Sequence, residues 1–286
     1  MDIRAILMGL AFAAMWSSAF TSARVIVAYA PPLSALALRF LISGLIGIAI
    51  AWALGQSARL TRRQWAGVVI FGLCQNALYL GLNFVAMQTI PASLAAIIAS
   101  SMPLLVALSG WLIFGTKVRT LGIAGLFAGL FGVVLIMGAR LSGGVDLYGL
   151  VLCVIGVVSL TIATMAVMGA SSGGNILMIV GLQMLVGSAI LWPPALLLES
   201  FDINWNWQLV VAFIYTTLVP GLAATLVWFL LVRRIGAVKA ATFHFLNPFL
   251  GVAVAAVLLG ERIGVLDIVG VAIIAGGILA VQLSKQ

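Results

Sequence analysis

Apolar residues occupy the chain in long runs that are separated by short polar gaps. A helix needs about 20 such residues to cross a hydrocarbon core of about 30 Å. Ten runs of about this length follow one another, at approximately 5–25, 33–54, 65–87, 92–114, 119–138, 147–169, 174–198, 207–231, 238–259 and 264–282. The gaps between them are too short for a soluble domain. The pattern therefore predicts an all-α integral membrane protein with ten transmembrane helices.

The composition agrees with a chain whose solvent is lipid. Hydrophobic residues make up 64% of the sequence and charged residues only 7%, which excludes an ordinary soluble domain. The net charge of +8 raises the question of nucleic acid, but the cations lie in the gaps between apolar runs, so no nucleic-acid partner is expected. Cys74 and Cys153 lie inside apolar runs without paired spacing, so neither a disulfide framework, nor a metal site, nor a cofactor is predicted.

Basic residues are divided unequally between alternate gaps. With a cytoplasmic N-terminus, ten fall in cytoplasmic segments and three in external ones. The cytoplasmic set is Arg4, Arg59, Arg62, Arg63, Lys117, Arg119, Arg233, Arg234, Lys239 and Lys285, and the external set is Arg24, Arg140 and Arg262. Because basic loops stay in the cytoplasm, an even number of helices then places both termini there. The expected location is a bacterial cell inner (plasma) membrane.

The chain repeats itself with a shift of 145 positions. Eleven residues between positions 90 and 132 recur in this way, among them Pro103 with Pro248 and Gly115 with Gly260. We interpret this as a duplication with units at 1–140 and 146–286, each holding five helices. Five is an odd number, so the second unit is inverted in the membrane relative to the first. Such inverted repeats place a substrate site near the midplane and support alternating access.

Polar side chains inside the apolar runs are costly in lipid, so they are expected to face other helices or a water-filled cavity. In the third run Gly72, Asn76, Tyr79 and Asn83 recur at helical spacing, with Gln75 beside them. The 145-residue shift relates this stripe to one in the eighth run that includes Gly221, Thr225 and Trp228. A shared substrate cavity is the favoured interpretation of the set, and hydrogen bonding between packed helices is the alternative for each residue.

Five further residues are candidate substrate contacts. Trp16 lies near the middle of the first helix, and Thr164 lies on a soft, weakly polar face of the sixth. Ser100 and Asn247 lie beside the two paired prolines, where they can bond freed backbone groups or a ligand. His244 shares a face with Asn247 and could couple transport to protons, although a neutral structural histidine is the favoured alternative. Internal packing or hydrogen bonding remains open for all five.

Pro103 and Pro248 each remove a backbone donor within an apolar run. They are expected to kink helices four and nine at equivalent points, which makes them candidate gates or hinges together with Gly221. Arg39 lies about two turns inside helix two. We expect it to snorkel or to pair with a backbone carbonyl, and direct binding of a substrate carboxylate is the alternative.

Several short patterns, in order along the whole chain, resemble the drug/metabolite transporter superfamily and its EamA-type ten-helix exporters. They are Gly9 with Trp16-Ser17-Ser18, Arg39-Phe40, the stretches Ala92 to Pro103 and Ala240 to Pro248, and Leu259-Gly260-Glu261-Arg262. Length, short loops and the Asn-Pro pair of helix nine are similar to the aromatic amino-acid exporter branch. The sequence departs from strict repetition at Gly115-Thr116-Lys117, where an acidic residue matching Glu261 would be expected.

The resemblance implies a secondary transporter, and its direction, export, rests on the resemblance alone. Few charges lie within the membrane, which favours neutral, zwitterionic substrates such as aromatic and other large neutral amino acids. A multidrug transporter is the alternative, because aromatic cavities also accept cations. A sugar-phosphate carrier would need more deeply placed basic residues than Arg39, and an intramembrane enzyme would need a catalytic motif that the sequence lacks. The protein is expected to be a monomer or a homodimer.

Overall fold

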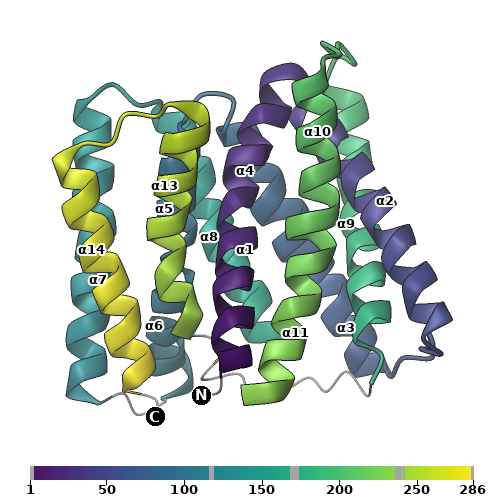
Figure 1. Ribbon diagram of the computed structural model, residues 1–286, viewed down its shortest axis with the longest axis horizontal. Coiled ribbons are helices and arrows are strands. Elements are labelled where there is room, and N and C mark those ends of the chain that lie inside the picture. Colours follow the sequence, from purple (N-terminus) through teal and green to yellow (C-terminus); the bar gives the residue numbers. More distant parts are fainter. Residues whose placement is uncertain (1–2, 116–118, 168–173, 236–239, 241, 285–286) are drawn as a thin grey trace.

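The computed structural model describes residues 3–115, 119–167, 174–235, 240 and 242–284. Lys117, Lys239 and Lys285, which contributed to the predicted orientation, lie outside the described residues. The described part is helical, and its elements run roughly side by side (Figure 1). They are α1 (Ile3–Tyr29), α2 (Pro32–Ala53), α3 (Arg62–Phe71), η1 (Gly72–Leu80), α4 (Gly81–Ala86), α5 (Ala92–Ala99), α6 (Met102–Phe114), α7 (Thr120–Ser142), α8 (Leu147–Val167), α9 (Ile176–Leu198), α10 (Trp207–Thr216), η2 (Thr217–Ala223), α11 (Ala224–Ile235), η3 (Thr242–Leu246), α13 (Asn247–Leu259) and α14 (Val265–Leu283).

Ten membrane spans account for these elements. Within the described residues, nine helices or continuous stacks of helices are long and apolar enough to cross a membrane, and Phe243–Leu259 is a shorter apolar helix at the position of the ninth predicted span. Three spans contain more than one element. One consists of α3, η1 and α4, another of α5 and α6, and the third of α10, η2 and α11. The predicted all-α membrane architecture is confirmed.

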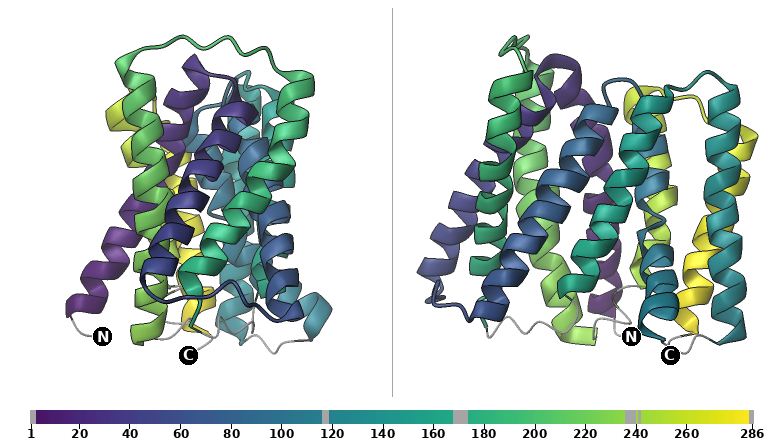
Figure 2. Two further views of the ribbon diagram at one scale, coloured as in Figure 1. Left: turned by 90° about the vertical axis from the view of Figure 1, so that its right-hand side faces the viewer. Right: turned by 180° about the vertical axis from the view of Figure 1, so that it is seen from behind.

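Both chain ends lie at the same end of the helix bundle, at the bottom of Figure 1. We call this the terminal face and the opposite one the distal face. Residues 30–31, 87–91, 143–146, 199–206 and 260–264 connect helices at the distal face, where the segment between α9 and α10 crosses the bundle (Figure 2). The pair formed by α7 and α14 lies at one side of the bundle, and α2 and α9 lie at the other (Figure 1).

Helix packing follows an inverted 5+5 repeat. The second helix of each half packs against its counterpart, α2 along α9, and the fifth does the same, α7 along α14. The first helix of each half packs against the fourth span of the other half, so α1 contacts α13 while α8 contacts α5 and α6. The third span of each half also packs against the first helix of the other half, with η1 against α8 and α10 against α1. Each contact thus has a partner in the other half.

Departures from regular α-helix also recur 145 residues apart. Two π-helical segments begin at Gly72 and at Thr217, on the third span of each half. Gly115 and Gly260 end α6 and α13 in the left-handed region, with φ of 62° and 66°, a conformation that glycine adopts without steric cost. Because π-helical turns concentrate at functional sites, their paired occurrence draws attention to the third spans.

The paired prolines break their spans, which differs from the predicted kink within a continuous helix. Pro103 lies in the first turn of α6 and Pro248 in the first turn of α13. Proline is tolerated there because the first N–H groups of a helix have no intrahelical acceptor. The fourth span therefore consists of α5 and α6, and in the ninth span η3 passes directly into α13.

Glycines allow α7 and α14 to pack closely. A Cβ atom at Gly277 would lie 2.5 Å from the carbonyl oxygen of Gly125, and one at Gly125 would lie 2.9 Å from the carbonyl oxygen of Gly277. In the same way, a Cβ atom at Gly132 would lie 3.0 Å from the carbonyl oxygen of Gly270, and one at Gly270 would lie 3.2 Å from that of Gly132. Small residues thus serve packing within the chain, as is usual between transmembrane helices.

Carboxylates cap helix starts at the distal face. Glu199, just beyond α9, accepts hydrogen bonds from the N–H groups of Leu33 at 2.7 Å and Ser34 at 2.8 Å, at the start of α2. Glu261 similarly accepts from the first two N–H groups of α5, at 2.7 and 3.0 Å. Negative groups are stabilised there by the helix dipole and by the unsatisfied N–H groups. Each cap joins the start of one helix in the first half to a segment of the second half.

The matching contact at the terminal face uses amides. The side chain of Gln56, beyond α2, accepts a hydrogen bond of 3.1 Å from the N–H of Met178 in the first turn of α9. The side chain of Asn175 accepts one of 3.0 Å from the N–H of Ser57. The pair formed by α2 and α9 is therefore capped by a charged group at one face and by neutral groups at the other.

Candidate functional site

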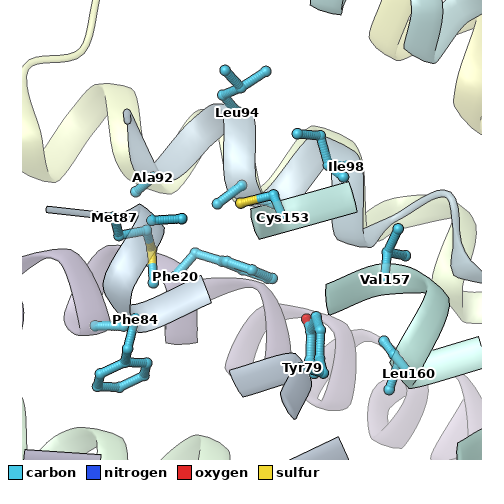
Figure 3. Packing of buried hydrophobic residues seen from close by; sticks show 14 of the residues in the cluster. Phe20, Tyr79, Phe84, Met87, Ala92, Leu94, Ile98, Cys153, Val157 and Leu160 are labelled. Carbon is cyan, nitrogen blue, oxygen red and sulfur yellow. The ribbon is translucent and has the colours of Figure 1, made fainter. Parts of the chain in front are cut away.

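A small central cavity lies about halfway along α1. Trp16 and Phe20 of α1, Tyr79 of η1, Leu160 of α8, and residues at the breaks of the fourth and ninth spans form its wall. The wall residues at the breaks are Ala99, Ser100, Met102, Pro103, His244 and Asn247. Figure 3 shows Phe20, Tyr79 and Leu160 within the surrounding apolar core. The cavity holds about 20 Å³, which is room for roughly one water molecule.

Six of the residues predicted from the sequence meet at this cavity. They are Trp16, Tyr79, Ser100, Pro103, His244 and Asn247. They come from α1, η1 and the two broken spans, and the breaks bring them together because each proline starts a new helix at the cavity wall. Whether they contact a substrate stays a prediction.

Asn247 contacts two polar groups at the start of α13. Its backbone carbonyl accepts a hydrogen bond of 3.4 Å from the hydroxyl of Ser17 on α1. Its amide nitrogen lies 3.0 Å from Nδ1 of His244. With the amide nitrogen as donor, Nδ1 accepts this bond in the tautomer that carries its proton on Nε2. The Oδ1 atom of Asn247 is buried and has no hydrogen-bond partner among the described residues.

Aromatic rings separate the cavity from the terminal face. The ring of Phe12, one turn before Trp16, lies 5.7 Å from Trp16, 4.7 Å from Trp228 and 5.4 Å from His244, measured between centroids. Trp228 and His244 meet edge to face at 5.1 Å. Such tilted and edge-on arrangements are the favoured geometries of aromatic pairs. Trp228, predicted as a substrate contact, thus lies in this cluster beside His244.

Sequence reasoning missed Phe12 and Phe20, although a signal for them exists. With Trp16 they recur at i, i+4 and i+8, and this spacing places the three rings along one face of α1. Trp16 and Phe20 line the cavity, and Phe12 lies between Trp16 and the terminal face. Aromatic spacing on the first helix would therefore have identified this wall.

The polar side chains of the third span face three different parts of the structure, namely the cavity, α9 and α8. Tyr79 lines the cavity. The amide nitrogen of Asn76 donates to the backbone carbonyl of Gln183 on α9 at 2.9 Å. Asn83 donates to the carbonyl of Tyr79 at 2.8 Å, and its Oδ1 accepts a weak bond of 3.4 Å from the thiol of Cys153 on α8. Two of the three polar side chains therefore bond to backbone or to a neighbouring helix.

Three other predicted contacts lie outside the wall of the cavity. Gln75 is half-buried on η1. The hydroxyl of Thr164 donates to the carbonyl of Leu160 at 2.8 Å and lies 3.8 Å from the sulfur of Met102, two residues that line the cavity. Thr225 donates to the carbonyl of Gly221, the predicted hinge residue, at 2.9 Å. Their substrate contact also stays a prediction.

Buried Arg39 supports the second π-helical segment. Its Nε donates to the carbonyl of Thr216 at 3.2 Å, and the hydroxyl of Ser43, one turn further along α2, donates to the carbonyl of Thr217 at 3.3 Å. A Cβ atom at Gly221 would lie 3.3 Å from a terminal nitrogen of Arg39. The predicted pairing of Arg39 with a backbone carbonyl is therefore observed, at the point where α10 changes into η2.

No cluster of three or more potential metal ligands occurs among the described residues. Arg140 and Asp267 form a salt bridge at the distal face, 2.7 Å apart. Among the described residues that line the central cavity, there is no carboxylate, lysine or arginine side chain.

Known proteins resemble this chain along nearly its whole length. The model of the EamA-like transporter family matches residues 3–138 and again residues 147–283. The transporter YvbV of Bacillus subtilis is 26% identical over 95% of this chain and 89% of its own length. The inner membrane transporter YedA of Escherichia coli K12 is 25% identical over 95% of this chain and 88% of its own length.

Two further comparisons concern substrate and fold. The aromatic amino acid exporter YddG of Ancylobacter novellus is 34% identical over 40% of this chain and 39% of its own length. A solved crystal structure superposes over 100% of both chains with a TM-score of 0.71 at 20% identity, which shows a shared fold. The double family match agrees with the inverted packing of two five-helix halves. The chain therefore belongs to the EamA-like transporter family and is a multi-pass membrane transporter of the drug/metabolite superfamily.

Proposed function

We propose that this transporter exports aromatic and other large neutral amino acids by alternating access through the central cavity. The observation that carries the proposal is the unpartnered Oδ1 atom of Asn247 in a wall built from aromatic rings without a carboxylate. An unpaired buried acceptor is costly unless a ligand donates to it. A substrate ammonium group can do so, and the rings of Trp16, Phe20 and Tyr79 can contact a large apolar side chain.

Helix ends at the cavity can bind the substrate carboxylate. The first turns of α6 and α13 begin at the wall, with Met102 and Asn247 among the lining residues. Helix starts attract anions through their dipole and their free N–H groups, and discontinuous helices use such ends at the midplane of transporters. The carboxylate and ammonium groups of one zwitterion are then held without a charged side chain.

Elements of the bundle approach each other closely on both sides of the cavity. At the terminal side Gly9 lies against the ring of Phe243, where an added Cβ would lie 2.3 Å away. At the distal side the corresponding Gly149 of the second half lies against Ile90, with 2.8 Å left for a Cβ. A cavity of about 20 Å³ is far below the roughly 300 Å³ of a small-molecule site, so binding requires one side to open.

We infer that the breaks at Pro103 and Pro248 act as hinges, with Gly221 in the π-helical segment as a third flexible point. With the terminal face in the cytoplasm, an amino acid enters from that face and leaves at the distal face.

Counterflow of radiolabelled phenylalanine in proteoliposomes tests the proposal. Competitors would be neutral, acidic and cationic amino acids, together with a lipophilic cation. We expect competition by aromatic and large neutral amino acids and little by the others. Absence of phenylalanine counterflow, combined with binding of the lipophilic cation, would favour a multidrug transporter, for which the aromatic wall offers cation–π contacts.

A further inference from the structure

A second and much larger cavity opens at the distal face, which we call the distal vestibule. It holds about 430 Å³, within the range of small-molecule sites. It lies among the distal ends of α1 and α13 and the starts of α5 and α10. Its wall includes Arg24, Tyr29, Thr89, Gln208, Leu259 and Glu261. None of the residues predicted from the sequence to contact the substrate is among the residues that line this vestibule.

The vestibule carries one charge of each sign. Arg24 and Glu261 both line it and are both half-buried. Arg24 is oriented by a hydrogen bond from Nη1 to the carbonyl of Met87. Glu261 is oriented by the first two N–H groups of α5. A guanidinium has five N–H donors and a carboxylate about four acceptor positions, so both groups keep capacity for a ligand.

Unpartnered polar atoms continue from the vestibule to the central cavity. Among the described residues, three buried side-chain oxygens or nitrogens have no hydrogen-bond partner, namely those of Thr21, Ser93 and Asn247. They lie on α1, α5 and α13, which pack on one another. Ser93 adjoins Glu261 through its own N–H, and Asn247 lines the central cavity. Thr21 lies one turn beyond Ser17, the residue bonded to Asn247.

Buried polar atoms are nearly always paired, so three exceptions at one interface require a reason. Hydration or a passing polar solute would satisfy them once α1, α5 and α13 separate. We place the route between the two cavities along these three atoms, with the vestibule at its distal end.

We propose that the distal vestibule is a second binding site for zwitterionic amino acids, in which Arg24 binds the carboxylate and Glu261 the ammonium group. This inference rests on the proposed function, because it assigns the same substrate class to a second position on its path. Charge-assisted hydrogen bonds from groups of both signs favour a zwitterion over an amine or an acid alone. Tyr29 and Leu259 supply apolar surface for the side chain of the substrate.

Protection of an engineered cysteine from alkylation tests the vestibule directly. Ala28 lines the vestibule and is exposed, so Ala28→Cys in a background with Cys74→Ser and Cys153→Ser reports its occupancy. The purified protein in detergent would be alkylated with a maleimide in the presence of phenylalanine, phenethylamine or phenylpropionate. We expect phenylalanine to slow the reaction at concentrations about tenfold lower than either analogue. Ser142→Cys, exposed at the distal end of α7, serves as the unprotected control.

Charge variants distinguish binding from structure. Arg24→Gln and Glu261→Gln should each raise the half-protecting concentration of phenylalanine about tenfold and remove its advantage over one analogue. Glu199→Gln removes a similar helix cap outside the vestibule and should leave protection unchanged. Equal protection by all three compounds, or full protection in both charge variants, would overturn the proposal.

Asn247→Leu separates this proposal from the proposed function. We expect it to abolish phenylalanine counterflow while protection at Ala28→Cys persists. Protection lost in Asn247→Leu but kept in Arg24→Gln would mean that the central cavity alone binds the ligand, which contradicts a vestibule site. Wild-type protein that shows protection without counterflow would refute the export proposal and leave the vestibule site intact.

Discussion

The hydroxyl of Ser17 and the backbone carbonyl of Asn247 join α1 to the start of α13 at the wall of the central cavity. The bond spans 230 positions of sequence and connects the first helix of one half to the broken span of the other. It fixes the backbone of Asn247 while the side chain bonds His244 and keeps one acceptor free. The start of α13 is thus held by α1, and its free acceptor belongs to a residue of the cavity wall, where we place the substrate.

Replacing Asn247 by leucine should reduce phenylalanine counterflow at least tenfold. The change removes the unpaired acceptor assigned to the substrate ammonium group. Asn76→Leu is the matched control, because Asn76 bonds to Gln183 between helices. It should lower stability by about 0.5–2 kcal/mol while the KM changes little. Initial counterflow rates and thermal unfolding of both purified variants check this, and similar counterflow by the two would contradict the assignment.

Removing the ring of Phe12 should open the cavity toward the terminal face. Phe12 contacts three rings that separate the cavity from that face. The test uses Ser100→Cys on the cavity wall in a variant whose native cysteines, Cys74 and Cys153, are replaced by serine. Phe12→Ala should raise the alkylation rate of this thiol about tenfold, which corresponds to about 1.4 kcal/mol less free energy for opening the barrier. Phe131→Ala, on a ring of α7 that is 61% exposed, should not. An unchanged rate in Phe12→Ala would show that the rings form no barrier.

Gly277 and Gly276 are adjacent residues that should respond oppositely to alanine. At Gly277 a Cβ would lie 2.5 Å from the carbonyl oxygen of Gly125, whereas at Gly276 it meets no atom within 4 Å. Gly277→Ala should therefore lower stability by about 1–3 kcal/mol. Gly276→Ala should be neutral or slightly stabilising, because alanine favours helix. Thermal unfolding in detergent measures both, and equal effects would refute the close packing of α7 and α14.

Neutralising the cap at the start of α2 should destabilise the protein without changing its selectivity. Glu199 accepts two backbone bonds and a third of 2.6 Å from the hydroxyl of Ser34. Glu199→Gln should cost about 1–2 kcal/mol in the free energy of unfolding, as loss of a helix cap does. Asp202→Asn, in the exposed connection to α10, should have no such effect. A stability loss shared by both variants would point to general surface charge instead of the cap.

Asp146, in the connection before α8, has a lowered pKa. The hydroxyl of Thr89 and the N–H groups of Gly149 and Tyr148 bond the carboxylate of Asp146 and hold its pKa below the ordinary value. A lowered folded-state pKa stabilises the fold above the unfolded pKa, and this contribution is lost as pH falls through the folded pKa. Asp146→Asn should therefore reduce the acid dependence of stability, measured by thermal unfolding between neutral and acidic pH.

The hydrophobic runs predicted the helices well because lipid imposes a minimum length on every span. The repeat could also be found, since Pro103 and Pro248 mark the same break in both halves. The spatial distribution of the polar stripe was not predictable from ideal helical spacing. The π-helical turn between Gly72 and Leu80 is wider than an α-turn, so Asn76 faces α9 while Tyr79 faces the cavity. Apolar composition does not distinguish the two kinds of turn.

The acidic residues were the other gap in sequence reasoning. Glu261 was singled out because position 116 breaks the repeat, yet its bonds to the start of α5 depend on a contact between sequence segments 169 residues apart. The vestibule has the same origin, because Arg24 and Glu261 come from opposite halves of the chain. Only the fold brings such groups together.

An inverted duplication makes the states open to either side equal in free energy wherever the two halves are alike. Glu261 breaks that equality, since the matching residue of the first half is Thr116, which has no carboxylate. In the proposed cycle, distal opening parts α5 from α13 and disrupts two charge-assisted bonds, each stronger than a neutral one. We therefore expect the empty carrier to rest closed to the distal side, with each 1.4 kcal/mol of difference changing the populations about tenfold. Residues without a counterpart in the other half would then bias a symmetric architecture toward one resting state.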